Sequence, residues 1–396
     1  MDFSYTPEQI EFRRRLVAWL DEQRRAGGVG SGEPRSLDDL VEAGKRWQKL
    51  LYDGGWCGLH WPAEYGGQGA GLIEQIIFQE ELARAGSPQL INLLALSMVG
   101  PLIIDHGTEE QKARYLKNIL TAEEIWCQGY SEPGAGSDLA SVRTSATLDG
   151  DEFVVNGQKV WTSYAQYADL CILLARSDPK AAKHKGLTLL IVDMHSPGVQ
   201  TRPLMQMNGD AEFNEVFFED VRVPKTNVIG RQGDGWTMAV AMLMYERATL
   251  TFQRQLQSRV AFNEMLEFAR ELRPDGTRAA DDPIFRQRLA RLRIESEALR
   301  LTSLRHLTKQ LQGDPPGPEG SMEKLFWSEM FQRMTETAMA MLGSFSVLAP
   351  GDPVAPMGGR WPHLYLYSRG RTIAAGSSEI QRSIIAERVL GLPRGR

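Results

Sequence analysis

The spacing of apolar residues changes its period twice along the chain. Near the start it is helical: Thr6 is a typical N-cap, Pro7 suits the first helical position, and apolar side chains follow about every 3.6 residues. Comparable patterns follow at residues 37–51, with Ser36 as the cap, at 72–85, in an apolar stretch over 90–106, and from 108–110. The first third of the chain is therefore predicted to be helical.

The middle third has shorter apolar segments that are rich in β-branched and aromatic residues and are separated by Gly, Pro, Asp or Asn. These segments are residues 146–155, 170–176, 187–193 and 215–223. They predict a small antiparallel β unit. From Trp236 the helical period returns, in runs over 238–272, 283–311 and 321–342 and in two shorter helices that end at Leu390. The predicted order is helices, β unit, helices.

Composition narrows the class of protein. The chain has 396 residues and a net charge of -5, so it can bury a large ligand but carries no basic excess for binding nucleic acid. No apolar run reaches the roughly 18 residues of a membrane span, and the first residues lack the apolar core of a signal peptide. We expect a cytoplasmic protein that does not bind nucleic acid and does not span a membrane.

Cysteine and histidine give no sign of a disulfide framework or a metal site. The three cysteines are scattered and odd in number, which fits thiols buried in the core of a protein in a reducing compartment. The six histidines show no ligand spacing, alone or with cysteine. No metal is predicted.

Small residues and hydroxyls are concentrated between Trp126 and Ala140, in the sequence WCQGYSEPGAGSDLA. A loop of this kind exposes backbone N–H groups, and glycine lets a ligand approach them closely, which suits phosphates and the polar edge of a flavin. An ordinary surface loop is the alternative. A second segment about twenty residues later, NGQKVWTS at 156–163, combines a turn, an aromatic ring and two hydroxyls, and the pair favours a nucleotide cofactor.

Another glycine-rich segment, at residues 66–71, carries no such function. The dinucleotide-binding fingerprint needs a strand before it and a parallel βαβ unit around it, whereas helices flank this segment. We interpret it as a loop.

Five motifs together resemble the acyl-CoA dehydrogenase family over essentially the whole chain. They are GYSEPGAGSD and NGQKVWTS in the middle, WPAEYGG and GTEEQKARYL before it, and SSEIQRSIIAERVLGLPR at the end. The resemblance implies an α+β, mainly α, fold: a helical N-terminal domain (1–122), a central antiparallel β-domain (123–230) and a C-terminal four-helix bundle (231–396). It also implies FAD, which takes a hydride from Cβ of an acyl-CoA while a carboxylate removes the α-proton.

The resemblance assigns cofactor contacts by position. Those in the β-domain are Gln128, Tyr130, Ser131, Gly136 and Ser137 along the flavin and its pyrophosphate, and Trp161, Thr162 and Ser163 along the ring. Ser377 and Glu379 are the contacts expected near the end of the chain, and Ser137 is also expected to touch CoA. The alternative for Trp161 is a strand residue that packs on the bundle, because aromatic residues are common in β cores.

The catalytic base is expected at Glu246. Many family members carry the base in a segment similar to 372–379, but alignment places Ala375 there, and alanine cannot accept a proton. Other members, the isovaleryl and long-chain types, carry it in a segment similar to 245–247. Glu246 also lies in an apolar run, where desolvation raises a carboxyl pKa toward a value useful to a base. A solvated helix edge is the alternative, and Glu379 is a rival carboxylate.

The backbone N–H of Ala375 is expected to polarise the thioester carbonyl, as the corresponding amide does in the family, and Arg247 is expected to face CoA. Two segments that relatives use to hold a neighbouring subunit's FAD are degenerate here, at 270–276 and 340–344. They indicate either a homo-oligomer with altered contacts or a heteromer with unequal FAD sites. Heteromeric relatives act on steroid side chains, which suggests a bulky acyl group.

The resemblance leaves two other functions open. One is a flavin monooxygenase or nitroalkane oxidase on the same fold, because fold does not fix chemistry. The other is a non-catalytic subunit of a heteromeric dehydrogenase. For the leading hypothesis, the expected partners are an acyl-CoA substrate and an electron-transfer flavoprotein or similar electron acceptor.

Overall fold

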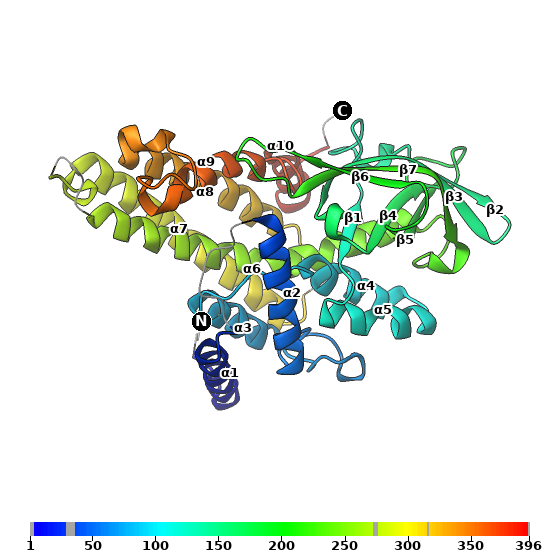
Figure 1. Ribbon diagram of the computed structural model, residues 1–396, viewed down its shortest axis with the longest axis horizontal. Helices are drawn as coiled ribbons and strands as arrows, with labels where there is room; N and C mark the ends of the chain where they lie inside the picture. Colours follow the sequence, from blue (N-terminus) through cyan, green and yellow to red (C-terminus); the bar gives the residue numbers. More distant parts are fainter. Residues whose placement is uncertain (1–3, 29–35, 272–275, 315–316, 395–396) are drawn as a thin grey trace. The chain divides into compact units, whose positions relative to one another are not determined.

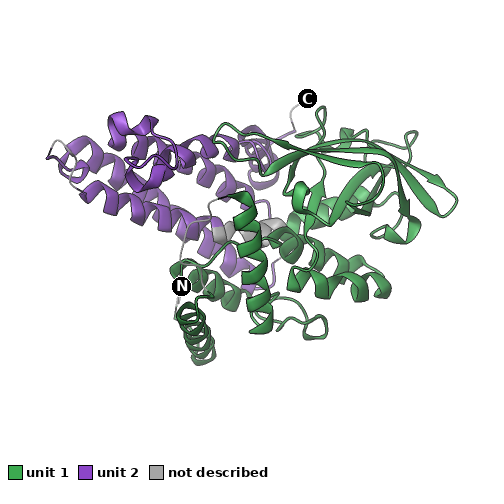
Figure 2. Ribbon diagram, viewed as in Figure 1, with its two compact units in different colours: residues 1–246 green, residues 247–396 purple. Residues whose placement is uncertain are grey.

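The computed structural model describes residues 4–28, 36–271, 276–314 and 317–394, without the side chains of 246–253. The chain divides into two compact units, residues 1–246 and residues 247–396 (Figure 2). Each unit has its own hydrophobic core. The predicted order of helices, β unit and helices is confirmed (Figure 1). The domain boundaries at 122/123 and 230/231 stay a prediction.

Some of the helices at the start of the first unit begin directly after the capping residues that the sequence predicts. They are α1 (Pro7–Arg25), α2 (Leu37–Asp53), α3 (Leu72–Arg84), α4 (Gly100–His106) and α5 (Glu109–Thr121). Thr6 and Thr108 each form a capping box with the Gln three residues later, and Ser36 accepts a hydrogen bond from the Asp39 amide. Residues 66–71 form a loop, as predicted.

The second half of the first unit is a seven-stranded sheet in the order β1-β4-β2-β3-β7-β6, with β5 paired to β4 (Figure 1). Its strands are β1 (Trp126–Gly129), β2 (Ser145–Asp149), β3 (Glu152–Ser163), β4 (Leu170–Arg176), β5 (Leu187–Asp193), β6 (Val199–Leu204) and β7 (Phe213–Pro224). Most pairings are antiparallel, as predicted, whereas β1 runs parallel to β4.

Three parts of the sheet differ from the sequence interpretation. Residues 126–129 form strand β1 instead of belonging to the loop, because their backbone pairs with β4, which is apolar and buried up to its last residue, Arg176. Strand β6 was not predicted; it is polar and contains Pro203, which the edge of a sheet tolerates. Residues 156–163 do not form a turn but belong to β3, whose pairing with β7 is irregular at two places.

Helix α6 (Gly235–Arg270) begins in the first unit, where Met238 and Met242 are buried in its core. The second unit contains the rest of α6 and α7 (Pro283–Leu311), α8 (Gly320–Leu342), α9 (Arg360–Arg371) and α10 (Ser378–Ile384). Its core includes Met265, Met334 and the fully buried Trp361. The long helical runs predicted from the sequence are confirmed to within a few residues.

None of the helices in the described part of the chain combines the length and apolar character that a membrane crossing requires.

Candidate active site

The two motifs of the middle third lie against each other. The Val160 amide on β3 donates a hydrogen bond of 2.9 Å to the carbonyl of Ser131, in the loop that follows β1. Within that loop, Glu132 and Ala135 exchange two backbone hydrogen bonds of 2.9 and 3.0 Å, which close a tight turn. The fold therefore brings residues 130–137 to the end of β3, where Trp161, Thr162 and Ser163 lie.

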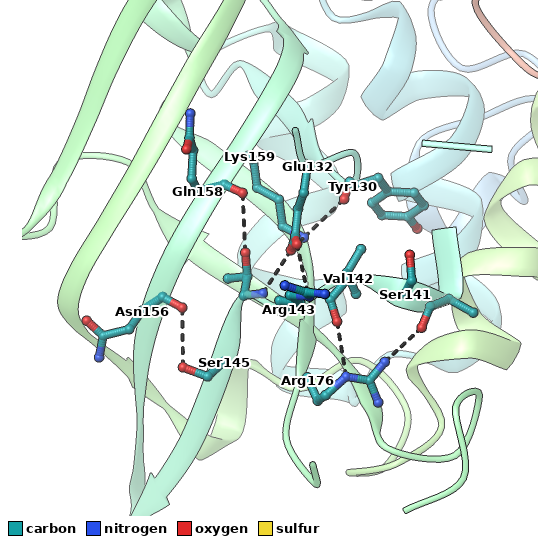
Figure 3. A network of polar contacts seen from close by, with 12 residues as sticks. Tyr130, Glu132, Ser141, Val142, Arg143, Ser145, Asn156, Gln158, Lys159 and Arg176 are labelled. Carbon is teal, nitrogen blue, oxygen red and sulfur yellow. Dashed lines mark hydrogen bonds and ion pairs between the residues drawn. The ribbon is translucent and has the colours of Figure 1, made fainter. Parts of the chain in front are cut away.

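A buried ion pair fixes this junction (Figure 3). The Lys159 side chain is fully buried, and its Nζ lies 2.8 Å from Glu132 and donates a 3.0 Å hydrogen bond to the Tyr130 carbonyl. The Glu132 carboxylate also accepts hydrogen bonds from the amides of Arg143 (2.7 Å) and Thr144 (2.9 Å). One carboxylate thus joins the loop, strand β3 and the segment that leads into β2.

Burial and charge act in opposite directions on this pair. Burial lowers the pKa of Lys159 to about 8, although the charge of Glu132 opposes that shift. Burial by itself would raise the pKa of Glu132, but the charge of Lys159 and the donated hydrogen bonds outweigh it and lower that pKa. At neutral pH the pair is therefore ionised on both sides.

Trp161 is held in an unusual conformation at the end of the same strand. Its φ is 61°, in the left-handed region, and its side chain is 60% exposed, with an edge-to-face contact to Phe213. It lies in the bulge between Lys159 and Thr162, where β3 carries one more residue than β7. Backbone strain that points a large aromatic ring outward is typical of ligand sites. A cofactor contact of Trp161 stays a prediction, as does the alternative of a strand residue that packs on the bundle.

Two substitutions at Trp161 separate its backbone strain from its ring. We expect Trp161→Gly to be about 1 kcal/mol more stable than Trp161→Ala, because glycine adopts a positive φ without a steric penalty. The family resemblance implies that the ring lies along the flavin, and both variants lose it, so we expect both to weaken flavin binding by the same factor, severalfold. Urea unfolding and flavin titration measure the two effects. Unequal flavin affinities of the two variants would show that the backbone at 161, rather than the ring, sets binding.

Two buried polar atoms near the junction have no hydrogen-bond partner within the described residues: Gln128 Nε2 on β1 and Thr162 Oγ1 on β3. The backbone of Thr162, by contrast, is hydrogen-bonded: its carbonyl accepts from the Asn214 side-chain amide at 3.1 Å. In the loop, a Cβ added at Gly134 or Gly136 would meet no protein atom within 4 Å, and neither glycine has a positive φ. The space and the donors both suit a ligand, and Ser137 beside them is exposed.

The loop also contacts the first turns of α6. The Tyr130 ring is buried in the core, and its hydroxyl donates to Met242 Sδ at 3.5 Å. Three residues later along α6, the Tyr245 hydroxyl donates to the Asp105 carboxylate of α4, and burial, with this bond, raises the pKa of Tyr245. These contacts anchor α6 immediately before position 246. The side chains of Glu246 and Arg247 lie outside the described residues.

The second unit contains the remaining predicted positions, in the turn between α9 and α10. Ala375 has a φ of 54° and Gly376 a φ of 89°, so two consecutive residues are left-handed. Ser377 caps α10 by accepting from the Ile380 amide at 3.4 Å. Glu379 is exposed in the first turn of α10, and its own backbone amide, followed by the Ser377 hydroxyl, lowers its pKa.

Comparison with known families agrees with this order of units. Residues 6–123 match the N-terminal domain of acyl-CoA dehydrogenases, residues 127–221 the middle domain and residues 233–390 the C-terminal domain. The chain belongs to the acyl-CoA dehydrogenase family. It is therefore an enzyme of the acyl-CoA dehydrogenase type.

Relatives of similar length support this membership. The chain is 42% identical to acyl-CoA dehydrogenase IpdE1 of Mycobacterium tuberculosis over 97% of this chain and 98% of the relative. Among solved structures, one described as the Tcur3481-Tcur3483 steroid ACAD is 33% identical, with a TM-score of 0.85 and full coverage of both chains. The ChsE4-ChsE5 complex from Mycobacterium tuberculosis is 35% identical, with a TM-score of 0.84 and full coverage of both chains.

The sequence motifs did not reveal the buried ion pair that holds the two motifs of the middle third together. Glu132 and Lys159 lie in the two motifs but are not among the predicted site residues. The available signal is a lysine directly before Val160 and Trp161, with a glutamate in the preceding glycine-rich loop. The three cysteines, by contrast, are buried free thiols, as predicted. Of the two degenerate segments, Arg270 ends α6 while 272–275 lie outside the described residues, and 340–344 cover the end of α8.

Proposed function

We propose that this chain binds FAD and removes the α- and β-hydrogens of an acyl-CoA thioester. The observation that carries the proposal is the junction of the glycine loop with β3, together with the unpartnered Gln128 Nε2 and Thr162 Oγ1. Buried polar groups are nearly always hydrogen-bonded, so these atoms suit a ligand that has many donors and acceptors. FAD is such a ligand, and when bound it would supply the acceptor for the β-hydride.

The residues that would hold FAD have distinct chemical roles. The amides and hydroxyls of the glycine loop suit the pyrophosphate, because glycine at 134 and 136 leaves room for close approach. The exposed Trp161 ring offers a flat apolar surface to the flavin. The proposed cofactor contacts are Gln128, Tyr130, Ser131, Gly136, Ser137, Trp161, Thr162, Ser163, Ser377 and Glu379. Because the ring of Tyr130 is buried, its contact would come from the backbone.

Glu246 is the proposed base that takes the α-proton. Position 246 lies one helical turn after Met242, which contacts Tyr130 of the flavin loop, and residues four apart share a helix face. The anchoring of Tyr245 to Asp105 limits movement of this turn. An apolar environment raises the pKa of a carboxyl group, which strengthens it as a base.

The thioester carbonyl must be polarised before a carboxylate can remove the α-proton. We assign this to the backbone N–H of Ala375, which makes no hydrogen bond in the part of the chain that the structure describes. The N–H needs no side chain, so it survives the replacement of the usual glutamate by alanine. Arg247 and Ser137 are the proposed contacts for CoA.

The direct test is anaerobic titration of the purified flavoprotein with acyl-CoA thioesters that range from short linear chains to branched and steroid groups. At least one thioester should bleach the oxidised flavin absorbance. If none does, while dithionite still bleaches it, the dehydrogenase function is wrong. An oxygen-dependent reaction with nitroalkanes would then point to the alternative chemistry, although the curated relatives named above are dehydrogenases.

A heteromeric assembly is the second part of the proposal. One structural relative is described as the ChsE4-ChsE5 complex, and another, which also carries a pair of designations, as the Tcur3481-Tcur3483 steroid ACAD. Together with the degenerate segments at 270–276 and 340–344, this favours a heteromer, a bulky polycyclic acyl substrate and an electron-transfer flavoprotein as acceptor. If so, the chain purified alone should hold less than one FAD per subunit. Full occupancy in a homo-oligomer would exclude unequal FAD sites.

A further inference from the structure

The turn between α9 and α10 is strained although it is exposed. Left-handed backbone costs roughly 1–2 kcal/mol for a residue with a Cβ, and Ala375 adopts it directly before the left-handed Gly376. A Cβ at Gly376 would also approach Gln381 Nε2 to 2.6 Å. An exposed turn could relax to an unstrained form, so something holds this one in place.

Two buried side chains hold the turn through its carbonyl groups. Lys324 of α8 donates from Nζ to the Gly376 carbonyl at 2.6 Å. Gln381 of α10 donates from Nε2 to the Ala375 carbonyl at 2.9 Å and to the Gly376 carbonyl at 3.2 Å. Lys324 is 5% exposed and Gln381 3% exposed. A hydrogen bond from a charged donor is about twice as strong as a neutral one.

The rest of the turn is closed by backbone bonds. The Ala374 amide donates to the Gly370 carbonyl at 2.9 Å, and the Ser378 amide donates to the Thr372 carbonyl at 2.9 Å. The peptide group that precedes Ala374 and the one that follows Ala375 are therefore fixed, on either side of the peptide group that carries the Ala375 N–H. The Ala375 N–H itself has no partner among the described residues. Its direction is set by the bonds that hold the rest of the turn.

Glu323, the residue before Lys324 on α8, makes separate contacts with α7. The Glu323 carboxylate accepts from Ser303 Oγ at 2.9 Å and lies 3.0 Å from His306 Nδ1, both on α7. This network ties the start of α8 to α7 in the buried core. The backbone from which Lys324 extends is thus held rigidly, which is what a side chain that positions another group requires.

We propose that Lys324 and Gln381 are positioning residues that hold the Ala375 N–H in the orientation needed to polarise the thioester carbonyl. This rests on the proposed dehydrogenase function. Neither residue is assigned a contact with the substrate. A hydrogen-bond donor aimed at developing negative charge contributes about 10²–10³-fold in rate, and part of that is lost when the donor is free to turn away.

The test uses the full-length holoenzyme with Lys324→Met, which keeps the length of the side chain but removes the donor. We expect flavin reduction at saturating acyl-CoA to slow about tenfold or more, while flavin content and substrate affinity stay within about twofold. The matched control is Lys309→Met, which removes an exposed lysine paired with Glu319 in the same unit and should change none of these quantities.

Gln381→Met provides an independent second variant, because it removes the other donor and leaves Lys324 in place. The proposal is overturned if both variants fold and reduce flavin at the normal rate. It is also overturned if both lose flavin or fail to fold, because the two residues would then serve structure alone. If the unmodified enzyme reacts with no thioester, the result would instead contradict the proposed dehydrogenase function itself.

Discussion

Glu246→Gln should retain bound flavin but slow its reduction by acyl-CoA by at least about 10²-fold, the usual scale of general-base catalysis. Glutamine keeps the size of the side chain and cannot accept the α-proton. Substrate binding should be little changed, since the lost interaction acts only when the proton moves. Stopped-flow absorbance under anaerobic conditions measures the reduction rate, and the change in the flavin spectrum on binding of a non-reactive thioether analogue measures affinity.

Glu379→Gln tests the rival carboxylate in the same experiment. Glu379 is the rival carboxylate, but it lies exposed in the first turn of α10 with a lowered pKa, which makes it a weaker base. Its substitution should change flavin reduction by less than about fivefold. If Glu379→Gln abolished reduction while Glu246→Gln reacted normally, the assignment of the base would have to move to the second unit.

The second large effect is expected at the buried ion pair. Lys159→Met should lower the free energy of unfolding by about 3–5 kcal/mol at pH 7, because it leaves the Glu132 carboxylate buried without its counter-charge. The same change should release flavin, since Lys159 also holds the Tyr130 carbonyl at the start of the loop. Urea unfolding followed by circular dichroism gives the first quantity, and flavin fluorescence gives the second.

This destabilisation should depend on pH in a defined direction. In Lys159→Met no lysine charge offsets the effect of burial on Glu132. The pKa of Glu132 in the folded state therefore rises above its unfolded value. A raised folded pKa contributes stability that is present at low pH and is lost as the pH rises. The difference between the two proteins should therefore shrink as the pH falls from 7 toward the ordinary pKa of a glutamate.

Two further variants test the cause. Adding Glu132→Gln to Lys159→Met should recover part of the lost stability, because the uncompensated charge is gone. Lys183→Met removes an exposed lysine that pairs with Asp138 in the same loop, and should cost at most about 1 kcal/mol. Equal losses for Lys159→Met and Lys183→Met would contradict the role given to burial.

The sequence predicted helices better than strands, for physical reasons that can be named. Helix starts depend on local capping, so Thr6 and Thr108 located α1 and α5 without reference to the rest of the chain. Strand β1 is four residues long and exists because β4 pairs with it, and β6 is a polar edge strand. Such strands depend on neighbours that local patterns do not reveal.

The candidate site was predictable in part. The two motifs identified by glycine, hydroxyl and aromatic residues do meet, through the bond between Val160 and Ser131. The ion pair of Glu132 and Lys159 could not be inferred with equal ease, because its effect on stability depends on burial. Sequence spacing does not reveal burial. The same holds for Lys324, whose contact with Gly376 joins residues 52 positions apart.

The bulge in β3 has a consequence for how this sequence can change. Residues two apart in a regular strand point to the same side, so without the bulge Lys159 and Trp161 would share one environment. Because of the extra residue, the fully buried Lys159 and the Trp161 ring, which is 60% exposed, can lie only two positions apart. A regular strand of the same length would turn either Lys159 outward or Trp161 inward, so changes that remove the bulge should be tolerated here far less than substitutions that keep it.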